Sequence, residues 1–115
     1  MRILIAIQGE DVAPRFDLAT EVCIAEVENG ALRNEPRIML LPVASGDELC
    51  ALILRETVTM VICGAIEEAH YQYLIWKKVT VIDGIIGPYR LALQWIGNGR
   101  LRPGNILSVK GSALP

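Results

Sequence analysis

The stretch VTMVICGAIEEAHYQYLIWKKVTVIDG, from Val58 to Gly84, indicates an α/β fold because its pattern changes twice. It opens with a short apolar run that ends at Cys63 and closes with a second one, VTVID. Between the two runs, acidic residues come first and Lys77 and Lys78 come last, which suits the dipole of a helix. The stretch therefore predicts a strand, a helix and a second strand parallel to the first.

The start of the chain predicts a third parallel strand. RILIAIQ, from Arg2 to Gln8, is a continuous apolar run ended by Gly9. Such a run is typical of a strand that is buried on both faces. We therefore expect it to lie centrally in the sheet.

Two further strands are expected at about Glu21 to Glu28 and at Arg37 to Val43. The pair Asn29-Gly30 between them accepts positive φ at little cost, which favours a hairpin. The second strand of this hairpin could start early and bend at Pro36. These strands should be antiparallel to each other.

Two more helices complete the pattern. Ser45 and Glu48 have the spacing of a capping box at the start of SGDELCALILRE. Pro88 suits the first turn of a helix in PYRLALQWIGNG, which Gly97 or Gly99 can end. The sequence thus predicts an α/β domain over residues 1–101, with a mixed five-stranded sheet and about three helices. Residues 102–115 have no clear period, and we expect a tail that is poorly ordered or docked on a partner.

Composition limits the class of protein. The chain has 115 residues, of which 52% are hydrophobic, and a net charge of −2. No apolar run approaches the ~20 residues that span a bilayer, and the start of the chain is too short for a secretory signal. The acidic balance argues against nucleic-acid binding. Three cysteines at irregular spacing make no disulfide framework. We expect a cytoplasmic protein, a monomer or weak homodimer.

The order of these motifs resembles the dinitrogenase iron-molybdenum cofactor biosynthesis family, over residues 1–101. The stretches that carry the resemblance are IAIQGEDV, APRFDLATEVCIAEVENG, VTMVICGAI and GIIGPYRLALQWIGNGRL. Two departures stand out: Asp17 replaces a usual glycine, and Glu67 and Glu68 fall in a loop that is usually richer in glycine. The two glutamates would repel an anionic cofactor.

This resemblance implies a ribonuclease-H-like three-layer fold and a role in nitrogen fixation. The protein would be a non-enzymatic carrier for an iron-sulfur or iron-molybdenum cluster, or its precursor, which it binds transiently. Cofactor-assembly or acceptor proteins would be its partners. A regulatory or interaction module that has lost cofactor binding is the alternative. A nuclease of the same fold class would need an acid in the first strand, and RILIAIQ has none.

Candidate ligands lie where ligands bind in open α/β sheets, beyond the carboxyl ends of the strands. Cys63 closes its strand, and His70, the only histidine, lies in the following helix. Thiolate and imidazole suit an iron-sulfur cluster, so we predict Cys63 and His70 as metal ligands. Arg15 and Gly64 are predicted to contact the cofactor, Arg15 through its charge.

Each of these residues also has a purely structural interpretation. Free cysteine is among the most buried residue types, so Cys63 can be a core thiol. His70 can be a surface or partly packed helix residue, because no partner for its ring is evident from the sequence. Arg15 can be a solvated loop residue. Catalysis is not expected, since the chain has no phosphate-binding or nucleophile motif.

Overall fold

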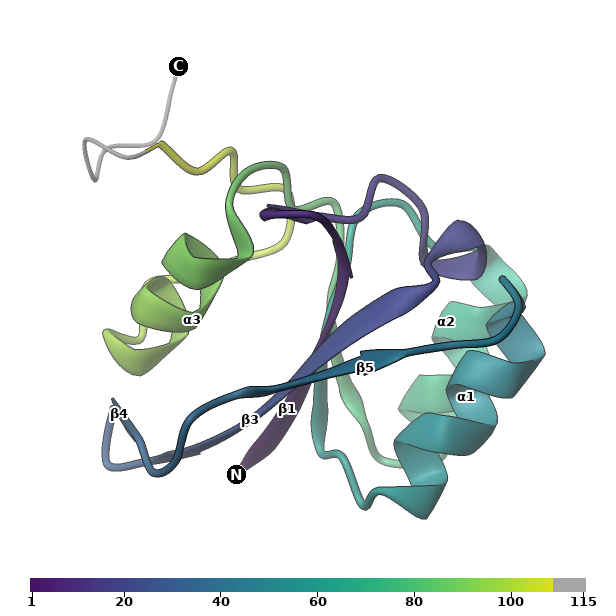
Figure 1. Ribbon diagram of the computed structural model, residues 1–115, viewed down its shortest axis with the longest axis horizontal. Helices are drawn as coiled ribbons and strands as arrows, with labels where there is room; N and C mark the ends of the chain where they lie inside the picture. Colours follow the sequence, from purple (N-terminus) through teal and green to yellow (C-terminus); the bar gives the residue numbers. More distant parts are fainter. Residues whose placement is uncertain (109–115) are drawn as a thin grey trace.

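The structure, a computed structural model, describes residues 1–108. It contains seven strands in one sheet, three α-helices and one short 3-10 helix (Figure 1). In chain order the elements are β1 (Arg2–Gln8), β2 (Asp11–Val12), η1 (Phe16–Leu18), β3 (Glu21–Glu28), β4 (Ala31–Leu32), β5 (Arg37–Leu40), α1 (Gly46–Arg55), β6 (Met60–Ile62), α2 (Glu68–Trp76), β7 (Thr80–Ile82) and α3 (Tyr89–Gly97).

The sheet is mixed, as predicted, with β1 at its centre. β1 pairs antiparallel with β3 and parallel with β6, and β7 is parallel to β6. β5 pairs antiparallel with the other side of β3. These five strands are those expected from the sequence. The sheet also contains β2 and β4, which are strands of two residues each. The prediction of an α/β domain with a mixed sheet and three helices is confirmed.

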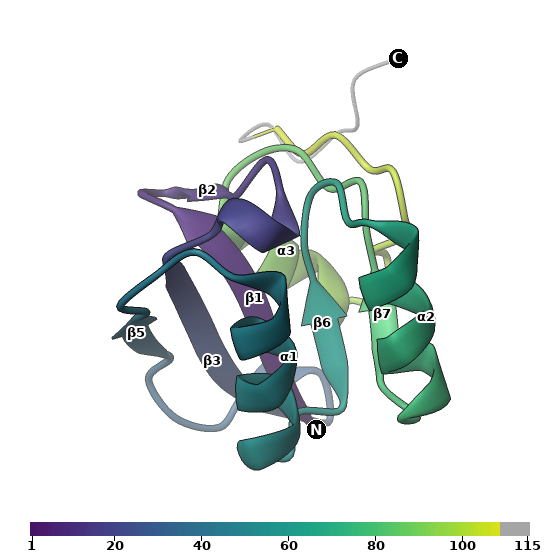
Figure 2. The same cartoon turned by 90° about the vertical axis from the view of Figure 1, so that its right-hand side faces the viewer.

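The sheet is the middle of three layers. Helices α1 and α2 cover one face and α3 covers the other (Figures 1 and 2). Side chains of β1 alternate between the two faces: Leu4 and Ala6 join the core under α1 and α2, whereas Ile3 and Ile5 join the core under α3. Burial on both faces explains why the run is continuously apolar. The ribonuclease-H-like assignment itself stays a prediction.

The predicted helix and turn signals have the expected geometry. The Ser45 hydroxyl oxygen accepts a hydrogen bond from the Glu48 N–H at 3.2 Å, so the cap of α1 is formed. Asn29 and Gly30 both have positive φ, 52° and 81°, in the turn between β3 and β4. The strand expected to bend at Pro36 is divided into β4 and β5.

The β3–β4 turn also contacts the end of α3. A Cβ at Gly30 would lie 2.8 Å from the Gly97 carbonyl oxygen, and one at Gly97 would lie 2.5 Å from that of Gly30. Each glycine therefore allows the other backbone to approach. Helix α3 ends at Gly97 with Asn98 as its C-cap, and Gly99, which has a φ of 70°, follows.

Residues 102–108 run back along the loop that follows β7. The Gly104 N–H donates to the Asp83 carbonyl, and the Leu107 N–H donates to the Ile86 carbonyl at 2.8 Å. Leu107 is buried in the core under α3. Residues 109–115 lie outside the described residues. For them the predicted tail, poorly ordered or docked on a partner, stays a prediction. In residues 1–108 no helix has the length and apolarity needed to cross a membrane.

Candidate functional site

The loops after β1, β6 and β7 meet at the carboxyl ends of the parallel strands (Figure 2). A groove lies between these loops. Its volume is about 420 Å³. We call it the strand-end groove and define it by its lining residues: Val12, Pro14, Gly64, Ala65, Gly84, Ile85 and Ile86. A second hollow of about 290 Å³ adjoins it and shares three of these residues, adding Gln8, Asp11 and Gly87. The location is the one expected for ligands in an open α/β sheet.

One wall of the groove is held by hydrogen bonds between the loop after β1 and the loop after β6. The Ala65 N–H donates to the Pro14 carbonyl at 2.8 Å, and the Phe16 N–H donates to the Ala65 carbonyl at 2.9 Å. Gly64 lies beneath this crossing: a Cβ there would be 2.5 Å from the carbonyl oxygens of Ala13 and Pro14. The predicted site residue Gly64 thus lines the groove, and its missing side chain lets the loop pass.

The opposite wall is the loop after β7. The Gly84 N–H donates to the Gly64 carbonyl at 2.9 Å, and the Ile85 N–H donates to the Cys63 carbonyl at 3.1 Å. Gly84 has a φ of 70°, a conformation that favours glycine. Ile86 is 61% exposed and presents its side chain at the groove. Backbone and apolar side chains therefore dominate the lining.

The Cys63 side chain points away from this groove. It is fully buried in the core under α1 and α2, with Val61 two residues earlier on the same side. Burial, and secondarily the charge of Asp83, raises the pKa of the Cys63 thiol to about 12. At neutral pH the thiol is protonated, whereas metal ligation requires the thiolate. Ligation by Cys63 stays a prediction that requires this core to open.

His70 belongs to the first turn of α2, and its side chain faces α1. Its ring rests over Gly46, where a Cβ would overlap the imidazole, and its centroid is 5.8 Å from that of Phe16. The Nε2 atom is 3.4 Å from Asp47 Oδ1. The Nδ1 atom is buried and has no hydrogen-bond partner within residues 1–108.

His70 also lines a hollow of about 360 Å³ between α1 and α2, which we call the helix hollow. Its other lining residues are Asp47, Cys50, Ala51, Ala69 and Tyr73. Burial raises the pKa of the Cys50 thiol to about 11, with a smaller contribution from Asp47. Across the described part of the chain, no three histidine, cysteine or acidic residues are grouped so that they could hold a metal ion. Cys63 is among the lining residues of neither the strand-end groove nor the helix hollow.

Arg15 does not line the strand-end groove but lies at its rim, because its chain neighbour Pro14 and its bridge partner Ala65 are both lining residues. Its backbone forms a bridge with Ala65. Its guanidinium donates to both oxygens of Asp17, at 3.2 Å from Nε and 2.9 Å from Nη2. Glu67 is 4.0 Å from the same Nη2 atom. The predicted cation is therefore present at the site, already paired with a carboxylate.

Most residues of the groove are not marked by any motif in the sequence. Val12, Pro14, Ile85 and Ile86 carry no reactive group that a motif search would select. The available signal was their position, because each lies just beyond a predicted strand end. Asp17 was identified as a departure from the family pattern, but its pairing with Arg15 was not foreseen.

Comparisons with known proteins identify relatives of the fold. No family model and no curated protein matches the chain. The solved structure of a protein called PH0822 has a TM-score of 0.82 at 17% identity and covers 90% of this chain and 94% of that chain. A candidate dinitrogenase from Methanocaldococcus jannaschii has a TM-score of 0.71 at 16% identity, covering 99% and 94%. The apo form of the orange protein from Desulfovibrio gigas has a TM-score of 0.70 at 18% identity, covering 89% and 91%. At these identities the likeness shows the fold.

Proposed function

We propose that this protein is a non-enzymatic carrier that holds a metal-sulfur cluster as cargo in the strand-end groove. The cargo would be an iron-sulfur or iron-molybdenum cofactor, or its precursor, in nitrogenase-type cofactor assembly. Proteins that donate or accept the cargo, and a cytoplasmic location, belong to the same proposal. The observation that carries it is the groove itself, which lies at the ligand edge of the sheet with Arg15 on its rim.

The chemistry of the lining supports carriage rather than catalysis. Of the seven groove residues defined above, none has a titratable side chain. A cluster seated there would contact apolar side chains and the backbone of Gly64 and Gly84, which glycine allows to approach closely. Because the Cys63 side chain is buried in the core and does not line the groove, the cargo would be held without a thiolate bond. Such binding is reversible, as transfer to an acceptor requires.

The solved structures of similar fold support the same direction. One is of a candidate dinitrogenase, and another is of the apo form of the orange protein. The resemblance in the order of motifs points to the same group of nitrogenase-associated proteins. We infer the class of cargo from these likenesses and its position from the groove.

The test is anaerobic gel filtration of the protein with isolated nitrogenase cofactor or its iron-sulfur precursor, with iron and molybdenum measured in the protein peak. Wild type should carry metal. Ile86→Glu should lose it, because the new carboxylate stands in the groove, whereas Ile75→Glu on the exposed side of α2 should keep it. Cys63→Ala and His70→Ala should also keep it, since neither side chain lines the groove. Absence of metal from the wild-type peak would refute the carrier.

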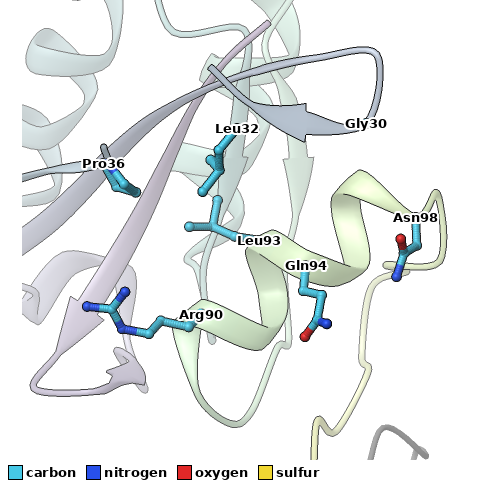
Figure 3. A pocket seen from close by; sticks show the side chains of 7 residues that line it. All are labelled: Gly30, Leu32, Pro36, Arg90, Leu93, Gln94 and Asn98. Atoms are coloured by element: carbon cyan, nitrogen blue, oxygen red, sulfur yellow. The ribbon is translucent and has the colours of Figure 1, made fainter. Parts of the chain in front are cut away.

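The alternative function, a protein-interaction module without cargo, is favoured by the α3 face of the sheet. A hollow of about 300 Å³ lies there between the β3–β4 hairpin and α3, where Leu32 and Leu93 approach each other and Arg90 stands at one end (Figure 3). Beyond it, Ile38 and Leu40 of the edge strand β5 are 48% and 74% exposed. Metal-free co-purification of one protein that Leu40→Asp abolishes would favour this function.

A further inference from the structure

We propose that Asp17 is a built-in counter-ion of Arg15, which anionic cargo must displace before Arg15 can bind it. Asp17 would thereby lower the affinity of the strand-end groove for anions and speed their release. This inference rests on the proposed carrier function. Within that function, Asp17 would set the affinity of the groove for its cargo.

In the pair, the Asp17 carboxylate occupies the position at which the Arg15 guanidinium would bind an external anion. Arg15 presents Nε and Nη2 to the two oxygens of the Asp17 carboxylate, at 3.2 and 2.9 Å. Two parallel hydrogen bonds of this kind are the arrangement by which arginine binds an external carboxylate or phosphate. An anion in the groove would therefore compete with Asp17 for the same edge of the guanidinium.

The exchange requires only side chains to move. The Arg15 backbone is fixed by its bridge to Ala65, and the next residue, Phe16, is fully buried. The Arg15 side chain is 52% exposed, whereas that of Asp17 is 20% exposed. Asp17 is thus the more confined partner. In the proposed exchange the more exposed Arg15 side chain would leave Asp17 for an anion in the groove, which Pro14 and Ala65 line.

The charge at the rim agrees with this assignment. Arg15 is accompanied by two carboxylates, Asp17 and Glu67, so the three charges sum to −1. Glu67 is farther from Nη2, at 4.0 Å, and is 57% exposed, so water screens it more than Asp17. The rim repels an anion until Arg15 leaves Asp17. The two residues therefore act as a unit in which Asp17 opposes binding and Arg15 promotes it.

The experiment measures binding of tetrathiomolybdate, a metal-sulfur dianion, to four proteins: wild type, Asp17→Asn, Arg15→Gln and the double variant. Asp17→Asn keeps the shape of the side chain and removes its charge. We expect its Kd at low salt to be lower by about fivefold, the upper range for an exposed ion pair, with a faster dissociation rate in wild type than in the variant. In the Arg15→Gln background the same change should have little effect, since the cycle isolates the pair.

Glu28→Gln is the matched control, because Glu28 pairs with Arg33 at 3.1 Å in the β3–β4 hairpin and its loss changes the net charge equally. It should leave the Kd nearly unchanged. Raising the ionic strength should reduce the effect of Asp17→Asn. Equal effects of Asp17→Asn and Glu28→Gln, an equal effect with and without Arg15, or no binding by Asp17→Asn would each overturn the inference. If wild type still carries metal in gel filtration, the carrier function survives that result.

Discussion

The helix hollow and the strand-end groove lie on either side of one loop, and they differ in what lines them. Phe16 points from this loop into the core and meets His70, whereas its neighbour Arg15 stands at the groove rim. The helix hollow contains the histidine, a cysteine and an aspartate. The groove contains glycine, proline and aliphatic residues. The Cys50 thiol and the His70 ring of the helix hollow pack against neighbouring residues, whereas residues without reactive groups line the groove.

Phe16→Ala is expected to have the largest effect, because it removes the anchor shared by the two regions. Phe16 is fully buried in the core under α1 and α2. Its truncation should lower the free energy of unfolding by about 3–5 kcal/mol, measured by urea denaturation. Leu18→Ala in the same loop, at an exposed position, should cost less than about 0.5 kcal/mol. Similar losses for the two variants would show that Phe16 is not an anchor.

Cys63 should resist alkylation in the native protein. Its pKa of about 12, against an ordinary value of 9.0, lowers the thiolate fraction at pH 8 by about 1,000-fold. Iodoacetamide followed by mass spectrometry should therefore modify Cys63 only after unfolding. Because the pKa is raised, the suppression holds at neutral pH and weakens only above about pH 9. Rapid native labelling of Cys63 would place it with the groove after all.

Because Gly46 contacts His70, we expect the substitution Gly46→Ala to change the free energy of unfolding in opposite directions in wild type and in His70→Ala. In wild type a Cβ at residue 46 would overlap the imidazole, so Gly46→Ala should destabilise by about 1–3 kcal/mol. In His70→Ala the overlap is gone, and the same change should stabilise by about 0.5–1 kcal/mol through better helix propensity. Denaturation of the four proteins tests this cycle. A destabilisation of equal size in the two backgrounds would mean that His70 does not pack on Gly46.

Ile86→Glu should have the smallest effect on stability, within about 0.5 kcal/mol, because the side chain is exposed. The same variant is expected to lose the cargo. A variant that is stable but cannot bind cargo would distinguish the two regions, because substitutions in the helix hollow should affect folding and those in the groove should affect binding. A thermal unfolding curve shifted by as much as that of Gly46→Ala would remove the distinction.

The fold could be predicted from the sequence because its signals are local. The buried strand Arg2–Gln8 is one apolar run, the hairpin follows from Asn29 and Gly30, and the cap of α1 follows from Ser45. Each signal needs only a few adjacent residues. Long-range contacts then only assemble elements that the sequence already indicates.

The candidate site was harder to predict because its parts meet only in the folded chain. Pro14 and Ile86 are distant in sequence, and the approach of their loops depends on backbone hydrogen bonds that leave no pattern. The direction of Cys63 was in principle readable. A strand alternates its side chains with period two, so Cys63 shares the face of Val61, under α1 and α2.

The central position of β1 has a consequence for synthesis of the protein. β1 is made before all of its partners, and its antiparallel partner β3 is complete at Glu28. Its other edge stays open until β6 has been made, which at about 5–20 residues per second takes roughly 2 to 7 s more. During that interval the nascent chain presents an apolar, unpaired strand edge. We expect a chaperone at the ribosome exit to bind this edge, and shortage of that chaperone to cause aggregation before the groove has formed.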